Sequence, residues 1–384
     1  MEVEIEKIVH GGYGFARLAQ GICLVPFAVP GDILDIECSP EDEVAFGWIK
    51  KIIRPSLYRK PSLCPVFGLC GGCDFDNMDY EYELNVKKNI LIEDLTRLAE
   101  VTRVPDGMPV ERVIYSMEYG YRNRAGFKVD SKGNIGFFRK KSHEVVPLPD
   151  NGCKLLQGEI NGYVSEIRNK KKFKEGGFRI RADTKGNIYR KGVPDIEDDK
   201  FCYCYIKGIK FRINIDDFFQ VNNFLTGKWV SQIELYLQPE KNDVIADLFC
   251  GSGLIALNLA KNVKSIIGIE LNKNAVRSAC YNADWNNIQN VSFVRGKAEQ
   301  GISSISNVNK IILDPPRFGL QKSLITAIVK LSARVIVYAS CDTATFSRDV
   351  KEFIKTGYLL EKITLVDMFP RTKHSEVVAR IVKS

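Results

Sequence analysis

The sequence predicts an α/β protein built in three parts. From about residue 216 onward, short continuous apolar runs alternate with helical segments, which is typical of a largely parallel sheet covered by helices on both faces. Near the N-terminus, short alternating runs are separated by Gly and Pro, as in a small β-barrel. A chain of 384 residues also has room for more than one core. We therefore expect a barrel over 1–58, a mixed α+β region over 59–215 and a Rossmann-like α/β domain over 216–384.

Residues 1–58 carry the pattern of an OB-like barrel. The runs VEIEKIVHGGYGFARL, GICLVPFAVPGDILDIEC and EVAFGWIKKIIRP divide into about five short strands. The pairs Gly11-Gly12 and Pro30-Gly31 mark turns. Barrels of this size often present a face to nucleic acid, and a barrel used only for packing is an equally open alternative.

The middle region combines a helix with two β-hairpins. Helical periodicity extends over residues 79–100, with Asp79 as the expected N-cap. Two alternating segments then turn at residues 132–134 and 185–187, both with the sequence Lys-Gly-Asn.

The C-terminal region alternates strands and helices up to its last two strands. The expected strands are DVIADLF, KSIIGIE, VSFVRG, KIILD and RVIVYAS, and helices are expected around 323–331 and 343–356 among others. The final pair, YLLEKITLVDMF and EVVARIV, has no helix between its members. We expect these two strands to form an antiparallel hairpin at the edge of the sheet.

Composition and charge exclude several classes of protein. No apolar run is long enough to span a bilayer, and no signal peptide is visible, so we expect a cytoplasmic protein. The net charge is +8, and basic residues gather at 139–141 and 168–174 beside Phe and Tyr. This pattern suits a nucleic-acid face, although solvated charge on strand edges would look the same. Eleven cysteines in a reducing compartment indicate thiol chemistry or metal ligands, and three histidines supply few imidazole-based sites.

A glycine-rich loop follows the first strand of the C-terminal region. In DLFCGSGLIA, Gly251 and Gly253 allow a tight turn and the next helix offers free N–H groups to a ligand. Glu270 ends the following strand, where a carboxylate can bind both hydroxyl groups of a ribose. Together with Ala256, the glycines also satisfy a loose dinucleotide pattern, so NAD is an alternative cofactor.

The fourth strand ends in LDPPRFG. Its Asp314 is expected to project into the ligand crevice, where it can accept hydrogen bonds from an amino group and a planar base. An Asp-Pro-Pro loop downstream of the glycine loop resembles the nucleic-acid methyltransferases that use S-adenosylmethionine (SAM), and it has no place in nicotinamide chemistry.

Cys341 ends the next strand, at the same edge of the sheet. A thiolate added to carbon 6 of a pyrimidine turns carbon 5 into a nucleophile that can take a methyl group. A base must then remove the carbon-5 proton, and Glu376, brought back by the last hairpin, is the candidate. A small buried cysteine is the alternative for Cys341 taken alone.

Four further cysteines have the spacing of a metal site. Cys64, Cys70 and Cys73 form C-x5-C-x2-C, and Cys153 can supply a fourth thiolate. Four thiolates suit either a [4Fe–4S] cluster or zinc. A free thiol is the alternative for Cys153 alone.

With these motifs, nearly the whole chain resembles the RNA uracil-5 methyltransferase family, which makes 5-methyluridine. The resemblance implies a TRAM-like barrel and a [4Fe–4S] cluster on the four spaced cysteines. It implies that Gln220, in FFQVN, contacts cofactor and target base. It also implies that Phe249 lies on a cofactor position, with Cys341 the nucleophile and Glu376 the proton acceptor. Leu254 departs from the family, in which a polar residue is common there, and this puts one cofactor hydrogen bond in doubt.

We therefore expect SAM-dependent methylation of carbon 5 of a uridine in RNA by a monomer. The TRAM-like barrel favours 23S rRNA, and uridine 54 of tRNA is the alternative. A non-catalytic RNA-binding assembly factor is a second alternative, and a NAD-type oxidoreductase a third. The 5-methylcytosine enzymes are disfavoured because the Asp-Pro loop here contains no cysteine.

Overall fold

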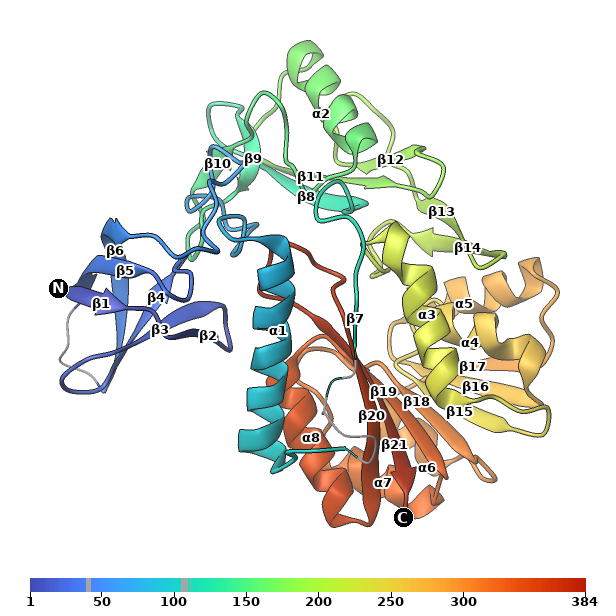
Figure 1. Ribbon diagram of the computed structural model, residues 1–384. Helices are drawn as coiled ribbons and strands as arrows, with labels where there is room; N and C mark the ends of the chain where they lie inside the picture. Colours follow the sequence, from blue (N-terminus) through green and yellow to red (C-terminus); the bar gives the residue numbers. More distant parts are fainter. Residues whose placement is uncertain (39–42, 105–109, 111) are drawn as a thin grey trace.

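The computed structural model describes residues 1–38, 43–104, 110 and 112–384 (Figure 1). In this part of the chain, strands form sheets of six, five, two and eight members. The six-stranded sheet stands to one side, and the eight-stranded sheet lies at the opposite end of the molecule from helix α2 (Figure 1). None of the helices described is long and apolar enough to cross a membrane.

The N-terminal sheet has its own small core. It consists of β1 (Glu2–Glu4), β2 (Lys7–Val9), β3 (Tyr13–Arg17), β4 (Ile22–Pro26), β5 (Ile33–Cys38) and β6 (Val44–Arg54), in the order β1-β5-β6-β4-β3-β2. Alternate residues such as Val25, Leu34 and Ile36 are fully buried between the strands. The sequence pattern therefore identified the β structure of this region and counted its strands to within one.

Helix α1 (Tyr80–Asp94) continues as a short π-helix (Leu95–Ala99). As predicted, Asp79 caps α1, because its side chain accepts hydrogen bonds from the N–H groups of Glu81 and Tyr82. Leu91 and Leu95 are buried in the core of the C-terminal sheet. Although its place in the sequence is in the middle region, the helix packs against the C-terminal sheet. The domain limits remain a prediction.

Both predicted hairpins of the middle region are present, and they share one sheet. Its strands are β8 (Arg124–Val129), β9 (Ile135–Phe138), β10 (Val145–Pro147), β11 (Gly176–Ala182) and β12 (Ile188–Lys191), in the order β10-β9-β8-β11-β12. Helix α2 (Gly158–Lys170) packs on this sheet through Ile160, Val164 and Ile167. A separate hairpin, β13 (Phe201–Ile206) and β14 (Ile209–Asn214), leads into the C-terminal region.

The eight-stranded sheet is parallel in one half. Its strands, in spatial order, are β17 (Val291–Arg295), β16 (Ser265–Glu270), β15 (Val244–Leu248), β18 (Lys310–Leu313), β19 (Val335–Ser340), β21 (Glu376–Lys383), β20 (Tyr358–Val366) and β7 (Arg112–Ile114). The helices are α3 (Asn223–Leu237), α4 (Leu254–Leu259) with a 3-10 turn (Ala260–Asn262), α5 (Lys273–Trp285), α6 (Ala298–Ser303), α7 (Lys322–Leu331) and α8 (Thr343–Lys355). Two core clusters, one with α1, α6, α7 and α8 and one with α3, α4 and α5, confirm the prediction of helices on both faces.

The predicted sheet edge is wrong. β20 and β21 do pair antiparallel, but β7 adds to β20 in parallel and forms the edge instead. Val113 of β7 lies opposite Leu365 of β20. Three residues carry too little periodicity to be recognised as a strand, and only the folded sheet shows where they pair.

Candidate active site

The glycine-rich loop after β15 has the backbone that its sequence suggests. Gly251 and Gly253 have φ values of +55° and +84°, in the left-handed region that glycine adopts at little cost. A Cβ atom at Gly253 would lie 2.9 Å from the ring of Phe293, so a side chain has no room there. The Gly251 N–H donates to Glu270 Oε2 over 3.1 Å, which ties this loop to the end of β16.

Buried carboxyl groups converge at this edge of the sheet. β15 and β18 are adjacent, with Leu248 opposite Leu313, so the loop after β15 and Asp314 are neighbours. Burial, and then Glu270, raises the pKa of Asp314 to about 7. Burial, and then Asp314, raises the pKa of Asp247 well above its usual value. Acids that repel one another in this way fit a positively charged ligand, such as the sulfonium and ammonium groups of SAM.

Cys341 and Glu376 meet beside Asp314. Ser340 at the end of β19 lies opposite Val377 of β21, so Cys341 and Glu376 occupy the next positions on these two paired strands. Burial raises the pKa of the Cys341 thiol to about 12, with Glu376 and then Asp314 as the next causes. Burial and Asp314 raise the pKa of Glu376 well above its usual value. The structure therefore brings together the three residues that the sequence picked from separate strands, while their roles remain predictions.

Gln220 lies on a segment that spans the site. Its side chain is 6% exposed, and its carbonyl oxygen accepts a hydrogen bond from Asn123 Nδ2 over 3.1 Å. Before it, Asp217 accepts from Asn272 Nδ2 over 3.3 Å, two residues past Glu270. After it, Asn222 Nδ2 donates to the carbonyl oxygen of Met368, in the loop before Glu376. The segment with Gln220 thus runs from the loop after Glu270 to the loop before Glu376.

Phe249 and Leu254 line opposite ends of the glycine-rich loop. Phe249 has a left-handed backbone, with φ +65°, and its ring packs against the core of the sheet. Leu254 begins α4 and is 8% exposed within the core on the α3 side. An aliphatic side chain buried in this way makes no hydrogen bond, so the doubt that the sequence raised about this position stands.

Two residues near the site were missed from the sequence. Arg317, in the loop after β18, lies with its Nη2 3.3 Å from Nε2 of His374, in the loop before Glu376. Burial, and then Arg317, lowers the pKa of His374 to about 4, so the imidazole is neutral at pH 7. Their closeness in the chain to Asp314 and Glu376 was the available signal.

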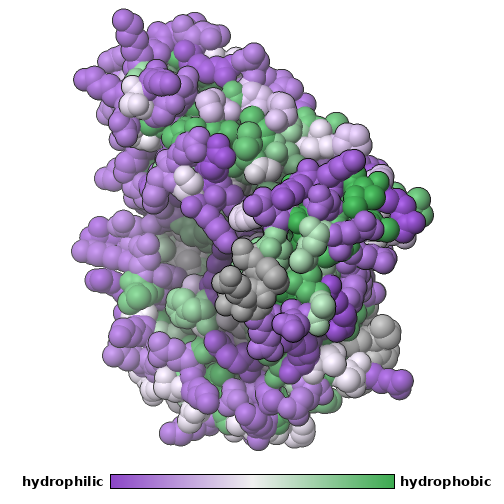
Figure 2. Space-filling view, turned by 90° about the vertical axis from the view of Figure 1, so that its left-hand side faces the viewer, coloured by the Kyte–Doolittle hydropathy of each residue, from purple (hydrophilic) through white to green (hydrophobic). Residues whose placement is uncertain are grey.

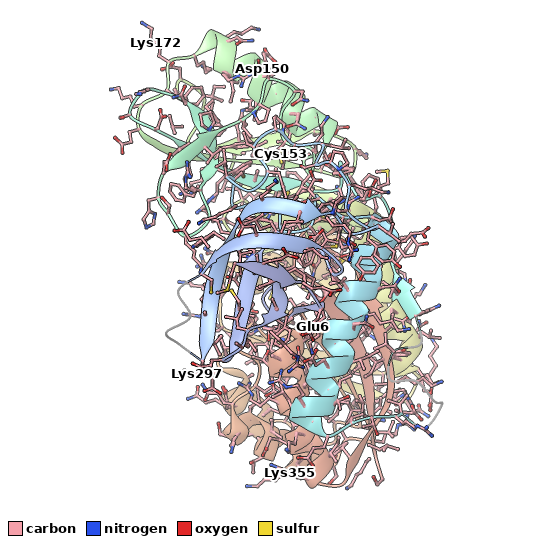
Figure 3. All side chains as sticks on the ribbon, turned by 60° about the vertical axis from the view of Figure 1, so that its left-hand side comes forward. Glu6, Asp150, Cys153, Lys172, Lys297 and Lys355 are labelled. Atoms are coloured by element: carbon pink, nitrogen blue, oxygen red, sulfur yellow. The ribbon has the colours of Figure 1, made fainter. Side chains whose placement is uncertain are left out.

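The four spaced cysteines are neighbours. Burial raises the pKa of Cys70 to about 11, and Cys153 and Cys64 add to the effect. The pKa of Cys73 is also raised by burial, and then by Cys153. Figure 3 places Cys153 within the middle region. The described residues nevertheless contain no group of three or more His, Cys, Asp or Glu side chains placed to hold a metal ion.

The basic residues divide into two kinds. Lys140 forms an ion pair with Asp74 over 2.7 Å and lies 4.8 Å from the ring centroid of Phe27, and Lys141 lies over Phe46. These two side chains therefore tie the middle sheet to the N-terminal sheet. Lys172 is exposed and projects outward near the end of α2 (Figure 3). The face shown in Figure 2 is largely hydrophilic, with smaller hydrophobic areas.

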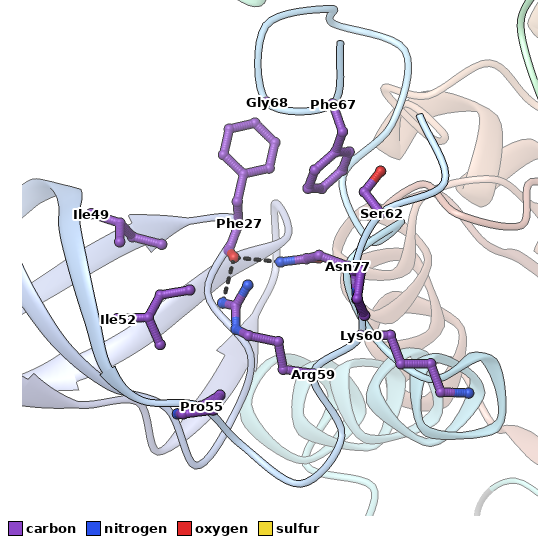
Figure 4. A pocket seen from close by; sticks show the side chains of 11 residues that line it. Phe27, Ile49, Ile52, Pro55, Arg59, Lys60, Ser62, Phe67, Gly68 and Asn77 are labelled. Carbon is purple, nitrogen blue, oxygen red and sulfur yellow. Dashed lines mark hydrogen bonds between the residues drawn. The ribbon is translucent and has the colours of Figure 1, made fainter. Parts of the chain in front are cut away.

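A cavity of about 580 Å³ lies away from this site, between the N-terminal sheet and the cysteine segment (Figure 4). Its walls include Phe27, Ile52 and Phe67. The Phe27 carbonyl oxygen accepts hydrogen bonds from Arg59 Nη2 and Asn77 Nδ2. The cavity is a junction between two parts of the protein and contains none of the residues discussed above as catalytic.

The chain is similar to known RNA methyltransferases along its length. A family model described as tRNA (Uracil-5-)-methyltransferase matches residues 204–383. An uncharacterized RNA methyltransferase of Leptospira interrogans is 31% identical over 98% of this chain and 93% of its own length. The 23S rRNA (uracil(1939)-C(5))-methyltransferase RlmD of Marinomonas posidonica is 28% identical over 99% of this chain and 94% of its own length.

A solved structure shares the fold along the whole chain. The tRNA (uracil-54, C5)-methyltransferase of Pyrococcus abyssi, in complex with S-adenosyl-L-homocysteine, is similar with a TM-score of 0.77. The match covers 100% of both chains at 24% sequence identity. The full-length match at 31% identity shows that the chain belongs to the RNA methyltransferases, and its residues 204–383 match the model described as tRNA (Uracil-5-)-methyltransferase.

Proposed function

We propose that this protein transfers a methyl group from SAM to carbon 5 of a uridine in RNA. The observation that carries the proposal is the meeting of Cys341 and Glu376 at neighbouring positions beside Asp314. When bound, SAM supplies an electrophilic methyl group. Gly251, Glu270 and Asp314 would hold it, since the glycine turn and the carboxyl groups lie together where the parallel strands end, and carboxylates suit a positively charged ligand.

The protein groups then act in order. The Cys341 thiolate bonds to carbon 6 of uracil, and the electron pair released into the ring makes carbon 5 nucleophilic. After carbon 5 has taken the methyl group, Glu376 accepts its proton. The electrons of that carbon–hydrogen bond rebuild the double bond and release the Cys341 thiolate. Asp314 and Gln220 are proposed to orient the cofactor and the target base.

The RNA is proposed to be 23S rRNA, because relatives of this description match the chain from end to end. Uridine 54 of tRNA is the second candidate, favoured by the family description and by the structural match. The protein should be incubated with radiolabelled SAM and each RNA, and the RNA digested to nucleosides. Labelled 5-methyluridine from 23S rRNA alone is expected; label from tRNA alone would reassign the substrate, and no label from either RNA would refute the proposed activity.

Two variants test the mechanism. Cys341→Ala should form neither product nor adduct, because no atom can add to carbon 6. Glu376→Gln should add to the base and accept the methyl group but fail to lose the carbon-5 proton. It should therefore accumulate a protein–RNA adduct that survives denaturation on a gel. Full activity in Cys341→Ala, or an adduct formed by that variant, would show that another nucleophile acts.

We further propose that residues 1–58 are a TRAM-like domain and that Cys64, Cys70, Cys73 and Cys153, which are neighbours but are not arranged as a metal site in this structure, hold a [4Fe–4S] cluster. The separate core of the N-terminal sheet supports the first, and the mutual influence of the thiols supports the second. Anaerobically purified protein should contain about four irons and labile sulfide per chain. Stoichiometric zinc without sulfide would identify a zinc site instead. Light scattering of the purified protein tests the proposed monomer.

A further inference from the structure

The loop between β20 and β21 leads into Glu376, and its side chains are all buried or half-buried. Residues 367–375 include no exposed side chain, and Asp367, Met368, Arg371 and Thr372 are at most 4% exposed. Loops of hairpins normally run over the surface, where water satisfies their backbone. Here the partners come from α1 and from the segment that follows Cys73.

The backbone of Arg371 is hydrogen-bonded through both its N–H and its carbonyl group. Its φ is +65°, a conformation that a residue with a long side chain keeps only when its surroundings enforce it. Its N–H donates to Glu83 Oε1 of α1 over 2.8 Å. Its carbonyl oxygen accepts from the N–H groups of Asp74 and Phe75, at 3.0 and 3.1 Å. The peptide groups on either side of this residue are therefore bound to two segments far away in sequence.

The side chain of Arg371 makes further contacts in the same region. Its Nη1 donates to the carbonyl oxygen of Met78 over 2.8 Å, and its Nη2 forms an ion pair with Glu118. The guanidinium group also lies over the rings of Tyr80 and Tyr119, with the central carbon 5.2 and 5.1 Å from the ring centroids. A planar fork with several donors is required for all these contacts at once, which lysine cannot provide.

The start of the loop is anchored independently. Lys87 of α1 is 1% exposed, and its Nζ lies 2.7 Å from both Glu83 and Asp367. It also donates to the Phe369 carbonyl oxygen over 3.2 Å, and the Tyr80 hydroxyl donates to Asp367 over 2.8 Å. The start and the middle of the loop thus depend on α1, whereas Cys341 lies between β19 and α8.

We propose that Arg371 is a positioning residue for Glu376, and that it serves the removal of the carbon-5 proton but not the addition of Cys341 to the base. The inference rests on the proposed function. Glu376 follows the loop directly, because it is the first residue of β21, and it pairs with Val366 at the end of β20. The approach of its carboxylate to the base therefore depends on where the loop lies. A displacement of about 1 Å slows a reaction step that needs close approach by up to about a hundredfold.

The test compares Arg371→Lys with wild type in single-turnover reactions with SAM and RNA that carries tritium at carbon 5 of uridine. The lysine variant keeps the charge but loses the fork. Methyl transfer into the adduct should stay near the wild-type rate, while tritium release falls about tenfold or more and the denaturation-resistant adduct accumulates. With deuterium at carbon 5, the variant should show a primary isotope effect on product formation larger than that of wild type.

A second variant covers the case in which Arg371→Lys fails to fold. Glu118 is 37% exposed and forms an ion pair with Arg371. Glu118→Gln should therefore fold, keep methyl transfer near the wild-type rate and show a smaller decrease in tritium release than Arg371→Lys. Arg334→Lys is the matched control. Arg334 lies just before β19, is half-exposed and forms an ion pair with Asp243. This variant should leave both rates unchanged.

The outcomes separate two failures. If wild type forms neither adduct nor product, the proposed function and this inference both fall. If wild type reacts and the folded variants lose methyl transfer and tritium release in parallel, without adduct, Arg371 has a general structural role and the inference alone is overturned.

Discussion

Asp314→Asn should make the free protein more stable at pH 8, and the gain should disappear as the pH falls. A carboxyl group whose pKa is raised by folding binds its proton more tightly in the folded protein than in the unfolded chain. It therefore favours folding at low pH, and this contribution is lost as the pH rises from the unfolded pKa to the folded pKa. Asparagine has no proton to lose, so the variant does not suffer this loss.

The magnitude follows from the pKa of Asp314, which burial and Glu270 raise to about 7. An aspartate in an unfolded chain has a pKa of about 3.9. The difference of about three pH units, at about 1.4 kcal/mol each, corresponds to about 4 kcal/mol between pH 4 and pH 8. Because Glu376 shares the site, part of this free energy belongs to the interaction of the two carboxyl groups.

Urea unfolding of wild type and variant at pH 4.5, 6 and 8 measures this difference. Asp284→Asn is the matched control for the loss of one carboxyl group, since Asp284 is exposed on α5. The free energies of unfolding of wild type and Asp314→Asn should be similar at pH 4.5 and diverge toward pH 8. Parallel curves for the two proteins would refute the argument that Asp314 is a buried acid next to other acids.

Three further predictions concern other parts of the protein. In the free protein, Cys341 should react with iodoacetamide slowly at pH 8 and faster toward pH 12, because its thiol pKa is raised to about 12; fast reaction at pH 8, measured peptide by peptide, would contradict this. Cys73→Ser should destabilise the middle region in hydrogen exchange while SAM binding, measured by calorimetry, is retained; loss of SAM binding alone would reverse the assignment. Lys172→Ala should weaken RNA binding and flatten its salt dependence. Lys140→Ala should also lower the melting temperature, because it removes the ion pair with Asp74. Equal melting temperatures for the two variants would show that Lys140 does not differ from Lys172 in its structural role.

Much of the fold could be predicted because its signals are local. The Lys-Gly-Asn turns, the Asp79 cap and the apolar strands of the C-terminal sheet each need only a few neighbouring residues. The edge strand β7 and the packing of α1 depend on contacts between distant segments. Leu91 is buried in a core that also contains residues of α8 and β20, and nothing in the sequence around it indicates those partners. Such contacts are fixed by topology, which a periodic pattern does not contain.

The site shows the same division at the level of single residues. Asp314, Cys341 and Glu376 could be found because each is a polar residue at the end of an apolar strand. Glu83 and Lys87 could not, since a glutamate four residues before a lysine on a helix is the ordinary pattern of an exposed ion pair.

In the structure this pair is at most 1% exposed and binds Asp367, which lies 280 residues from Lys87 in the chain. Burying such charges costs several kcal/mol per ion, and apolar residues of similar volume are often as stable or more stable there. Stability therefore gives no reason for the network. Its geometry does, because buried Lys87 binds both Asp367 and the Phe369 carbonyl oxygen and so holds the loop that leads to Glu376, the proposed proton acceptor.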